Sequence, residues 1–383
     1  MKKKRELGIE LLRIIACFLV VVIHIKLSDL ENDGGIIKEQ VLLSCLSGYA
    51  VAVFFAITGC FWYRQDKPFK DVIIKHVRTI LIPTFVVIMI FLIFREYLFA
   101  ENIIPTIADV SVPNMGNFFK GILSQTPELI GQHDTFAIYW YVIDFTLLLI
   151  WYPLVRVIVK DEIGEKIMWA FVIIAFINRA FEEIQWFTNW DFNIREISIV
   201  PMALVMTMLG HLIYSKKEFI LNNARVCRIC SVILYLSTII MSYILQYKLY
   251  KTNPSMGPEF ANWKHTPAFL IVISLLVFFI SLDNLKIGNV AQKIILTLSS
   301  FTFYIYLIHN GVTLKMMSTG FFWILRERMV ENLPSHGKYL LVSFVMAVLV
   351  IVFSTPMCII VKWFNQVIQS GIDGLIKLVK NDR

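Results

Sequence analysis

Three ionisable residues lie within the first hydrophobic stretch of the chain, where charged side chains are costly. The stretch is apolar over roughly the 20 residues that a membrane-spanning helix needs, and it contains Glu10, Arg13 and His24. Ionisable groups inside a bilayer are expensive and therefore usually mark a functional site. The pattern predicts a helix that crosses the membrane and also carries chemistry.

The spacing of these residues places them on one face of the predicted helix. At ~100° and ~1.5 Å per residue, Arg13 and His24 are about three full turns and ~16 Å apart. Glu10 lies one turn before Arg13, so the two side chains can form an ion pair that orients the guanidinium group for an anion. Histidine is the usual general base near neutral pH. The alternative interpretation is that Arg13 reaches the lipid headgroups and that His24 marks the membrane edge.

The composition places the chain among polytopic membrane proteins. It has 383 residues, of which 57% are hydrophobic and 17% are charged, and its mean hydropathy is +0.69. Such values exclude a soluble globular domain. The net charge of +8 fits basic cytoplasmic loops. Because the basic residues form no nucleic-acid-binding motif, we expect no nucleic-acid partner.

Neither disulfide bonds nor a metal site is predicted. Four of the six cysteines fall inside hydrophobic stretches, a distribution that argues against a disulfide framework. The remaining pair, Cys227 and Cys230, has no second cysteine pair or histidine at ligand spacing. We therefore expect no bound metal.

About ten hydrophobic stretches are long enough to cross a bilayer. The loops between them alternate between basic and mixed composition, which predicts that both termini are cytoplasmic. We expect an all-α transmembrane bundle over residues 1–361, followed by a cytoplasmic amphipathic tail at 362–383 on the inner membrane surface. The predicted spans are residues 7–27, 40–63, 79–98, 136–156, 166–181, 197–214, 228–247, 266–282, 294–314 and 338–361.

A second helix with polar side chains is predicted near the end of the chain. Thr302, Tyr306 and His309 recur at helical spacing and therefore share one face. Their polar groups need partners in hydrocarbon, so this face should point into the bundle. By the predicted topology, His309 lies near the outer leaflet, as His24 does.

Aromatic and basic residues of two further spans fit a binding site. Trp140 and Tyr141 would supply aromatic walls near the outer end of the fourth span, or else belong to the aromatic belt of the membrane interface. On the inner side, Lys75 and Arg78 could hold the phosphate groups of an anionic cofactor together with Arg13. The competing interpretation is that these cations only set the topology.

These motifs follow one another along nearly the whole chain. They are Glu10-x-x-Arg13 with His24, Phe54-Phe55-x-x-Thr58-Gly59, Lys75-x-x-Arg78 with Pro83, Trp140-Tyr141, and Thr302-x-x-x-Tyr306-x-x-His309. The ordered set resembles the membrane-bound acyltransferase family 3. That family includes bacterial O-acetyltransferases of surface polysaccharides and the membrane domains of vancomycin-resistance serine racemases. Thr58 stands where the family usually has serine.

The resemblance implies an integral membrane O-acyltransferase of a bacterial plasma membrane. Such an enzyme would move an acyl group, by expectation acetyl, from cytoplasmic acetyl-CoA to a hydroxyl group of an extracytoplasmic glycan. Acetyl-CoA is then a co-substrate, and no metal is expected. The expected donor-binding residues are Glu10, Arg13, Lys75 and Arg78, and the expected catalytic residues are His24, Tyr306 and His309.

The roles expected for the catalytic side chains follow from their positions. His24 would act on the acceptor hydroxyl group as a general base, or else carry the acyl group transiently. Tyr306 and His309 would orient or polarise that hydroxyl group rather than bind the donor, because their helix places them near the outer face.

Two other functions remain compatible with the residues. A transporter of a small, serine-like molecule is the main alternative, because the serine racemase relatives are linked to transport, and a partner-dependent accessory subunit is the other. As an acyltransferase, the chain would have an acyl-CoA, a glycan acceptor and the lipid bilayer as partners. Two further partner hypotheses are a second copy of the chain and the machinery that assembles surface glycans.

Overall fold

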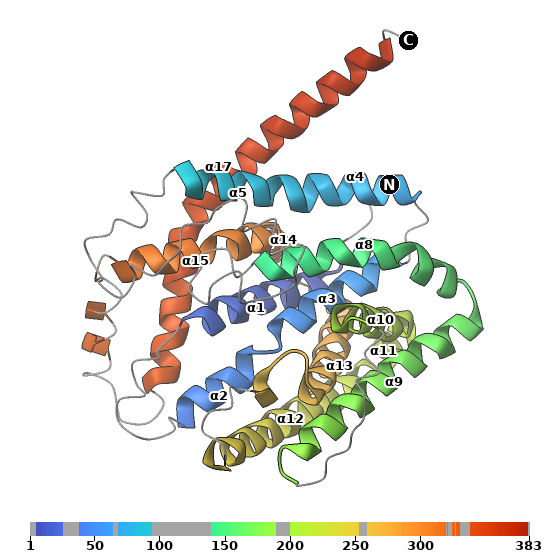
Figure 1. Ribbon diagram of the computed structural model, residues 1–383, viewed down its shortest axis with the longest axis vertical. Helices are drawn as coiled ribbons and strands as arrows, with labels where there is room; N and C mark the ends of the chain where they lie inside the picture. The colour runs from blue at the N-terminus through green and yellow to red at the C-terminus, as the bar shows by residue number, and fades with distance from the viewer. Residues whose placement is uncertain are drawn as a thin grey trace. The chain divides into compact units, whose positions relative to one another are not determined.

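The computed structural model describes residues 5–25, 38–63, 68–93, 139–188, 200–252, 259–285, 287–318, 320, 324–325, 327–329 and 338–381. Helices dominate these residues, which include no strand (Figure 1). The chain is therefore an all-α protein, as its sequence predicts. It divides into two compact units, one of Met1–Asp66, Leu147–Thr302 and Tyr339–Ser343, the other of Lys67–Thr146, Phe303–Lys338 and Phe344–Arg383.

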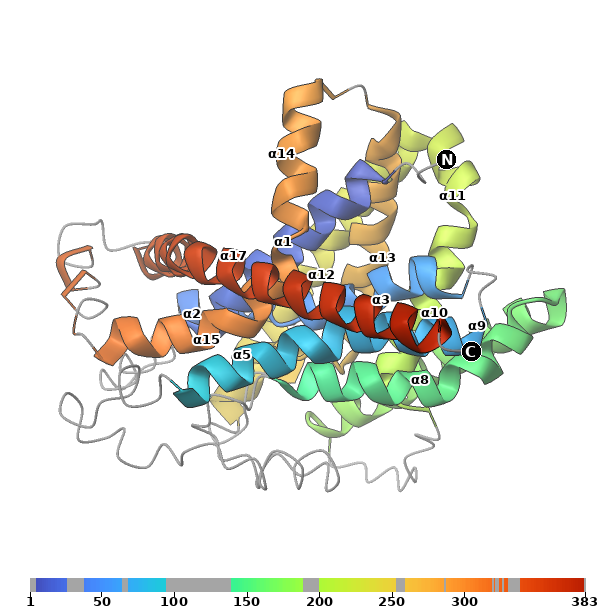
Figure 2. The same ribbon diagram turned by 90° about the horizontal axis from the view of Figure 1, so that it is seen from above.

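The first unit contains the N-terminal helix and the helices around it. These helices are α1 (Leu7–His24), α2 (Lys38–Ser47), α3 (Ala50–Trp62), α9 (Glu162–Gln185), α10 (Met202–Ser215), α11 (Lys217–Asn222), α12 (Ala224–Thr252), α13 (Thr266–Ser281) and α14 (Asn289–Ser299). Helix α1 packs against α3, α13 and α14, and Figure 2 shows α14 alongside it. Ala16, Cys17 and Val20 of α1 are buried. The helix face that carries Arg13 and His24 is thus largely enclosed.

The described residues of the second unit also form helices. They are α4 (Phe69–His76), a π-helical segment (Val77–Leu81), α5 (Ile82–Ile93), α15 (Thr302–Ser318), α17 (Lys338–Asn381) and the start of α8 (Trp140–Ile158). The third span therefore starts earlier than the predicted residue 79. Helix α17 continues without a break through position 361, where the amphipathic tail is expected to begin.

Among the residues that the structure describes, seven segments are long and apolar enough to cross a membrane, and an eighth is added if α14 and α15 count as one broken span. The chain is a multi-pass membrane protein. The predicted count of about ten is not confirmed by the described residues, because α10 has only 14 residues and α9 carries charged residues at both ends. The seven segments are Leu7–His24, Lys38–Trp62, Phe69–Phe91, Trp140–Ile158, Ala224–Thr252, Glu259–Asn284 and Tyr339–Gly374.

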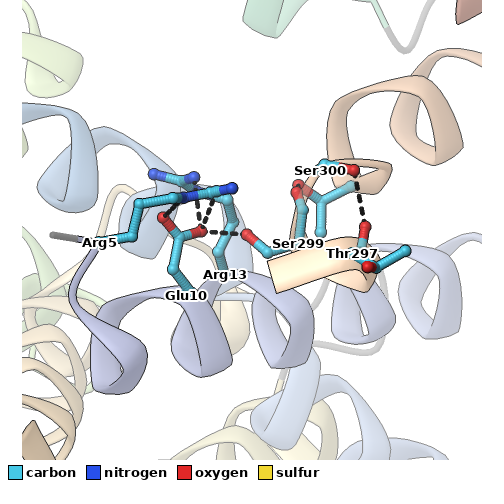
Figure 3. A network of polar contacts seen from close by, with 7 residues as sticks. Arg5, Glu10, Arg13, Thr297, Ser299 and Ser300 are labelled. Carbon is cyan, nitrogen blue, oxygen red and sulfur yellow. Dashed lines mark hydrogen bonds and ion pairs between the residues drawn. The ribbon is translucent and has the colours of Figure 1, made fainter. Parts of the chain in front are cut away.

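The predicted ninth span is broken at Ser300 and Phe301. The last turn of α14 tightens there, because the Ser300 N–H donates to Thr297 O at 3.1 Å and the Phe301 N–H donates to Leu298 O at 2.9 Å. The Ser300 hydroxyl group also donates to Thr297 O, at 2.7 Å (Figure 3). These local hydrogen bonds end α14, and a new helix starts at Thr302.

Two glycines allow α3 and α10 to approach each other closely. A Cβ atom on Gly59 would lie 1.8 Å from the Thr207 carbonyl oxygen, and one on Gly210 would lie 2.0 Å from the Ala56 carbonyl oxygen. No side chain tolerates such distances, so only glycine fits at this crossing of two apolar helices. The glycine of the Thr58-Gly59 motif therefore has a packing role.

Gly59→Ala is expected to destabilise the protein by about 3 kcal/mol, because the added methyl group must push α3 away from α10. The measurement is the thermal unfolding midpoint of the purified protein in detergent. Gly371→Ala is the matched control, since Gly371 lies in α17 and has nothing within 4 Å of its Cβ position. Alanine at that position should leave the midpoint unchanged or raise it. Equal midpoints for the two variants would contradict the packing role of Gly59.

Candidate active site

Glu10 and Arg13 form the ion pair that their spacing predicts at the start of α1. Arg13 Nη1 lies 2.9 Å from Glu10 Oε2, one helical turn away. Glu10 is buried, with 7% of its surface exposed, whereas the Arg13 side chain is partly exposed. The buried carboxylate therefore holds the guanidinium group in place through a charge-assisted hydrogen bond.

A second arginine binds the same carboxylate. Arg5 donates from Nε to Glu10 Oε1 at 2.8 Å, and its Nη2 lies 2.8 Å from Glu10 Oε2. This is the bidentate arrangement that a planar guanidinium group favours. Figure 3 shows the Arg5 and Arg13 guanidinium groups together over the Glu10 carboxylate. Sequence reasoning missed Arg5, because Arg5 precedes the helix and helical spacing does not pair it with Glu10.

The third partner of Glu10 comes from far along the chain. Ser299, the last residue of α14, is buried and donates its hydroxyl hydrogen to Glu10 Oε2 (Figure 3). We call Arg5, Glu10, Arg13 and Ser299 the Glu10 cluster. Two guanidinium groups and one carboxylate leave the cluster with a net positive charge, so it is suited to bind an anion.

A second polar network anchors the N-terminal end of α1. Asp283 Oδ1 accepts a hydrogen bond from the Gly8 N–H at 2.8 Å, and Asp283 Oδ2 lies 2.9 Å from Lys217 Nζ, which is also 2.9 Å from Glu6 Oε1. Burial alone would lower the pKa of Lys217, but its hydrogen bonds to Asp283 and Glu6 raise that pKa above its ordinary value. Lys217 therefore stays charged, and the start of α1 is held in place.

His24 ends α1, on the same continuous helix as Glu10 and Arg13. The helix has no break between Arg13 and His24, so their axial separation of ~16 Å follows from helix geometry. His24 is half-buried. The Ile25 N–H closes the helix by donating to Val22 O at 3.1 Å. One rigid element thus carries the arginine at one end and the histidine at the other.

Tyr306 and His309 lie on a buried face of α15, as their spacing predicts. Tyr306 is 6% exposed and His309 is 0% exposed. His309 Nδ1 lies 2.7 Å from Tyr306 O and 3.2 Å from Ile305 O. Because a carbonyl oxygen can only accept, Nδ1 must carry a hydrogen, and Nε2 is then the basic nitrogen of the neutral ring. This arrangement suits proton acceptance by Nε2.

Aromatic side chains at the start of α8 pack beside Tyr306. The Tyr141 ring meets the Tyr306 ring edge-on, with 5.4 Å between their centroids, and Trp140 meets Tyr141 edge-on at 6.5 Å. The predicted aromatic wall therefore lies next to the side chains of Tyr306 and His309. The Tyr306 ring is therefore buried among other aromatic rings.

The two basic residues predicted on the inner side differ in their surroundings. Lys75 of α4 is exposed. Arg78 lies in the π-helical segment, and its Nη2 is 2.5 Å from Asp373 Oδ1 of α17, a contact that the sequence did not reveal. The expected site residues are divided between the two units, with Glu10, Arg13 and His24 in the first and Lys75, Arg78, Tyr306 and His309 in the second.

Acidic and histidine side chains also meet at the start of α13. Glu183 Oε1 accepts a hydrogen bond from the Thr266 N–H at 2.7 Å and lies 3.4 Å from His265 Nδ1, while Glu259 Oε2 lies 3.2 Å from His265 Nε2. Glu183 thereby satisfies a backbone donor of the first turn of α13. Within the described ranges, no group of three or more His, Cys, Asp or Glu side chains is placed to hold a metal ion.

The sequence of the chain matches a known protein family. A family model described as an acyltransferase domain, of the type 3 family, matches residues 6–363. The chain belongs to acyltransferase family 3. No match was found among curated proteins or among solved structures. The match includes every site residue expected from the sequence, and the chain is a membrane acyltransferase.

Two parts of this family 3 acyltransferase lie outside the matched range. Arg5 precedes it, although the Arg5 guanidinium group completes the Glu10 cluster. Residues after 363 follow it, and they include Asp373, the partner of Arg78. The Arg5–Glu10 and Arg78–Asp373 contacts therefore each include one residue that the family model does not cover.

Proposed function

We propose that this acyltransferase moves an acetyl group from cytoplasmic acetyl-CoA to a hydroxyl group of an extracytoplasmic glycan, in a bacterial plasma membrane. The observation that carries the proposal is the Glu10 cluster, in which two guanidinium groups share one buried carboxylate. Arginine forks fit phosphate oxygens, and acetyl-CoA carries several phosphate groups. His24 lies at the other end of the same helix.

The charge of the N-terminus supports this orientation. Residues 2–5 are all basic, and short basic segments next to a span stay on the cytoplasmic side. The Glu10 cluster then faces the compartment that makes acetyl-CoA, and His24 faces the outer leaflet. An even number of spans, as when the broken pair is counted, would also keep the C-terminus inside.

The reaction breaks one thioester bond and forms one ester bond. The acceptor oxygen attacks the acetyl carbonyl carbon while His24 takes the hydroxyl proton. The carbon–sulfur bond then breaks, the thiolate of coenzyme A leaves, and His24 returns the proton to it. Tyr306 and His309 orient or polarise the acceptor hydroxyl group. Histidine is regenerated, so no further reactant is needed.

Tyr306→Phe and His309→Ala are expected to lower acyl transfer by about 10-fold and about 100-fold, because each removes a side-chain group that orients or polarises the acceptor hydroxyl group. Coenzyme A binding should be unchanged in both variants. Tyr247→Phe of α12 is the control, because its hydroxyl group makes no hydrogen bond within the described part of the chain. Weaker coenzyme A binding in either variant would contradict the assignment to the acceptor side.

The proposal as a whole is tested by incubating the purified protein in lipid nanodiscs with acetyl-labelled acetyl-CoA and a mixture of bacterial surface glycans. Label transferred to a glycan, thioester hydrolysis or self-labelling of the protein would support it. If acetyl-CoA neither binds nor is cleaved, and vesicles that contain the protein instead take up a small amino acid, the transporter alternative is correct.

A further inference from the structure

One arginine is contacted at both its backbone and its side chain by the C-terminal half of α17. Gln369 Nε2 donates a hydrogen bond to Arg78 O at 2.9 Å. Asp373 Oδ1, one helical turn further on, accepts from Arg78 Nη2 at 2.5 Å. All three residues belong to the second unit. Two consecutive turns of one helix thus hold a single residue of the π-helical segment.

The backbone contact replaces a hydrogen bond that the chain itself cannot make. In the π-helical segment the Ile82 N–H donates to Val77 O, so each donor lies five residues after its acceptor. By that spacing, the donor for Arg78 O would be residue 83, which is Pro83 and has no N–H. A backbone carbonyl without a partner in a membrane protein is costly. The Gln369 amide supplies the missing donor.

The contact is part of a polar stripe along α17. Asn365, Gln369 and Asp373 are spaced four residues apart and therefore share one helix face. Gln369 Nε2 also donates to Asn365 Oδ1 at 3.1 Å, and Asn365 Nδ2 donates to the Tyr304 hydroxyl oxygen at 3.2 Å. Large apolar residues of the same stretch are exposed, namely Trp363, Phe364, Val367 and Ile368.

A helix that only lay on the membrane surface would need the apolar residues but not the ordered polar stripe. Asn365 is 5% exposed and Gln369 is half-buried, whereas Asp373 is exposed, so the first two residues of the stripe are packed against protein. The stripe also begins beyond the end of the family match at residue 363. It is therefore a feature of this chain that the family pattern does not describe.

We propose that Gln369 is a positioning residue for Arg78, which binds a phosphate group of the acyl donor. Asp373 holds one nitrogen of the guanidinium group, and the remaining nitrogens, Nε and Nη1, make no hydrogen bond within the described residues. Those donors suit a phosphate oxygen. The inference rests on the proposed function, because it assigns the anion to acetyl-CoA.

Gln369→Leu and Gln369→Glu test the inference, since both keep a side chain of similar size and remove the N–H donor. Each should raise the dissociation constant for acetyl-CoA about 3- to 10-fold while the turnover of bound donor stays the same. Each should also speed hydrogen exchange of the amides at residues 79–82, because the support of the segment is lost. The experiment is done in detergent without phospholipid, so that no lipid phosphate competes.

The chain offers a matched control and a rescue. Gln366 lies in the same helix and is exposed, so Gln366→Leu and Gln366→Glu should change neither property. Pro83→Ala returns an N–H to position 83, and in that background Gln369→Leu should have little further effect. Midpoints of thermal unfolding for all variants show whether a loss of affinity reflects unfolding.

The possible results separate this inference from the proposed function. A wild-type protein that does not bind coenzyme A overturns the proposed function and with it the donor role of Arg78. A wild-type protein that binds coenzyme A, with Gln369 variants of unchanged affinity, overturns the inference alone, whatever the exchange rates. The inference is also overturned if Gln369→Leu lowers the affinity equally with and without Pro83→Ala. The loss of affinity would then not come from the lack of an N–H donor for Arg78 O.

Discussion

His24→Ala should bind coenzyme A normally and lose acyl transfer by ~10²–10⁴-fold, the usual range for removal of a general acid or base. A sugar hydroxyl group is a poor nucleophile until its proton is taken, and histidine is suited to take it near neutral pH. His24 stands at the end of a helix whose other end carries the donor cluster. Its loss should therefore affect the chemical step and not the binding of the donor.

Transfer is measured with labelled acetyl-CoA and glycan acceptor, and binding by titration with coenzyme A. His24→Gln keeps a polar side chain of similar reach but has no basic nitrogen, so it should lose as much activity as His24→Ala. If His24 instead carries the acyl group, the wild-type protein would become labelled without acceptor and His24→Ala would not. Near wild-type transfer by His24→Ala would contradict the role of His24 in acyl transfer, and the transporter alternative would then be favoured.

Arg13→Lys should weaken the binding of acetyl-CoA about as much as Arg13→Ala does, by roughly 10- to 100-fold. Arg13 uses Nη1 to contact the buried Glu10 carboxylate, and its planar fork can contact a phosphate group at the same time. A lysine ammonium group is a point charge on a flexible stem and cannot make both contacts in one geometry. Keeping the charge should therefore not keep the affinity.

Affinity is measured by titration of each variant with acetyl-CoA in detergent. Arg225→Lys is the matched control, because Arg225 of α12 is exposed and is not a member of the Glu10 cluster. It should bind the donor like the wild type. If Arg13→Lys keeps wild-type affinity and turnover, Arg13 serves only as a topology signal.

Local spacing was enough to predict the helices that carry the candidate site. Glu10 and Arg13 are one turn apart, and Tyr306 and His309 recur at helical intervals on one face of α15. Such relations depend only on the geometry of a single helix and on the cost of polar groups in hydrocarbon. These relations within one helix do not depend on how the helices pack together.

The number of spans was harder to predict, because hydropathy alone does not show where a helix begins, breaks or ends. The predicted ninth span is broken at Ser300 and Phe301 by hydrogen bonds within a single turn. The predicted sixth span corresponds to α10, which has only 14 residues. Serine and threonine hydroxyl groups can compete with the backbone hydrogen bonds of a helix. Such residues occur in many helices, so the sequence does not show which of them ends one.

Two long-range contacts of the candidate site were decided by the tertiary structure alone. Ser299 reaches Glu10 across 289 residues of sequence, and Gln369 reaches Arg78 across 291. Neither contact has a local pattern, because each depends on which helices pack together and at what height. A serine at the end of a helix and a glutamine in a long helix are common in any sequence. Packing brings the serine to the buried Glu10 carboxylate and the glutamine to the Arg78 carbonyl oxygen, and each acceptor needs a hydrogen-bond donor.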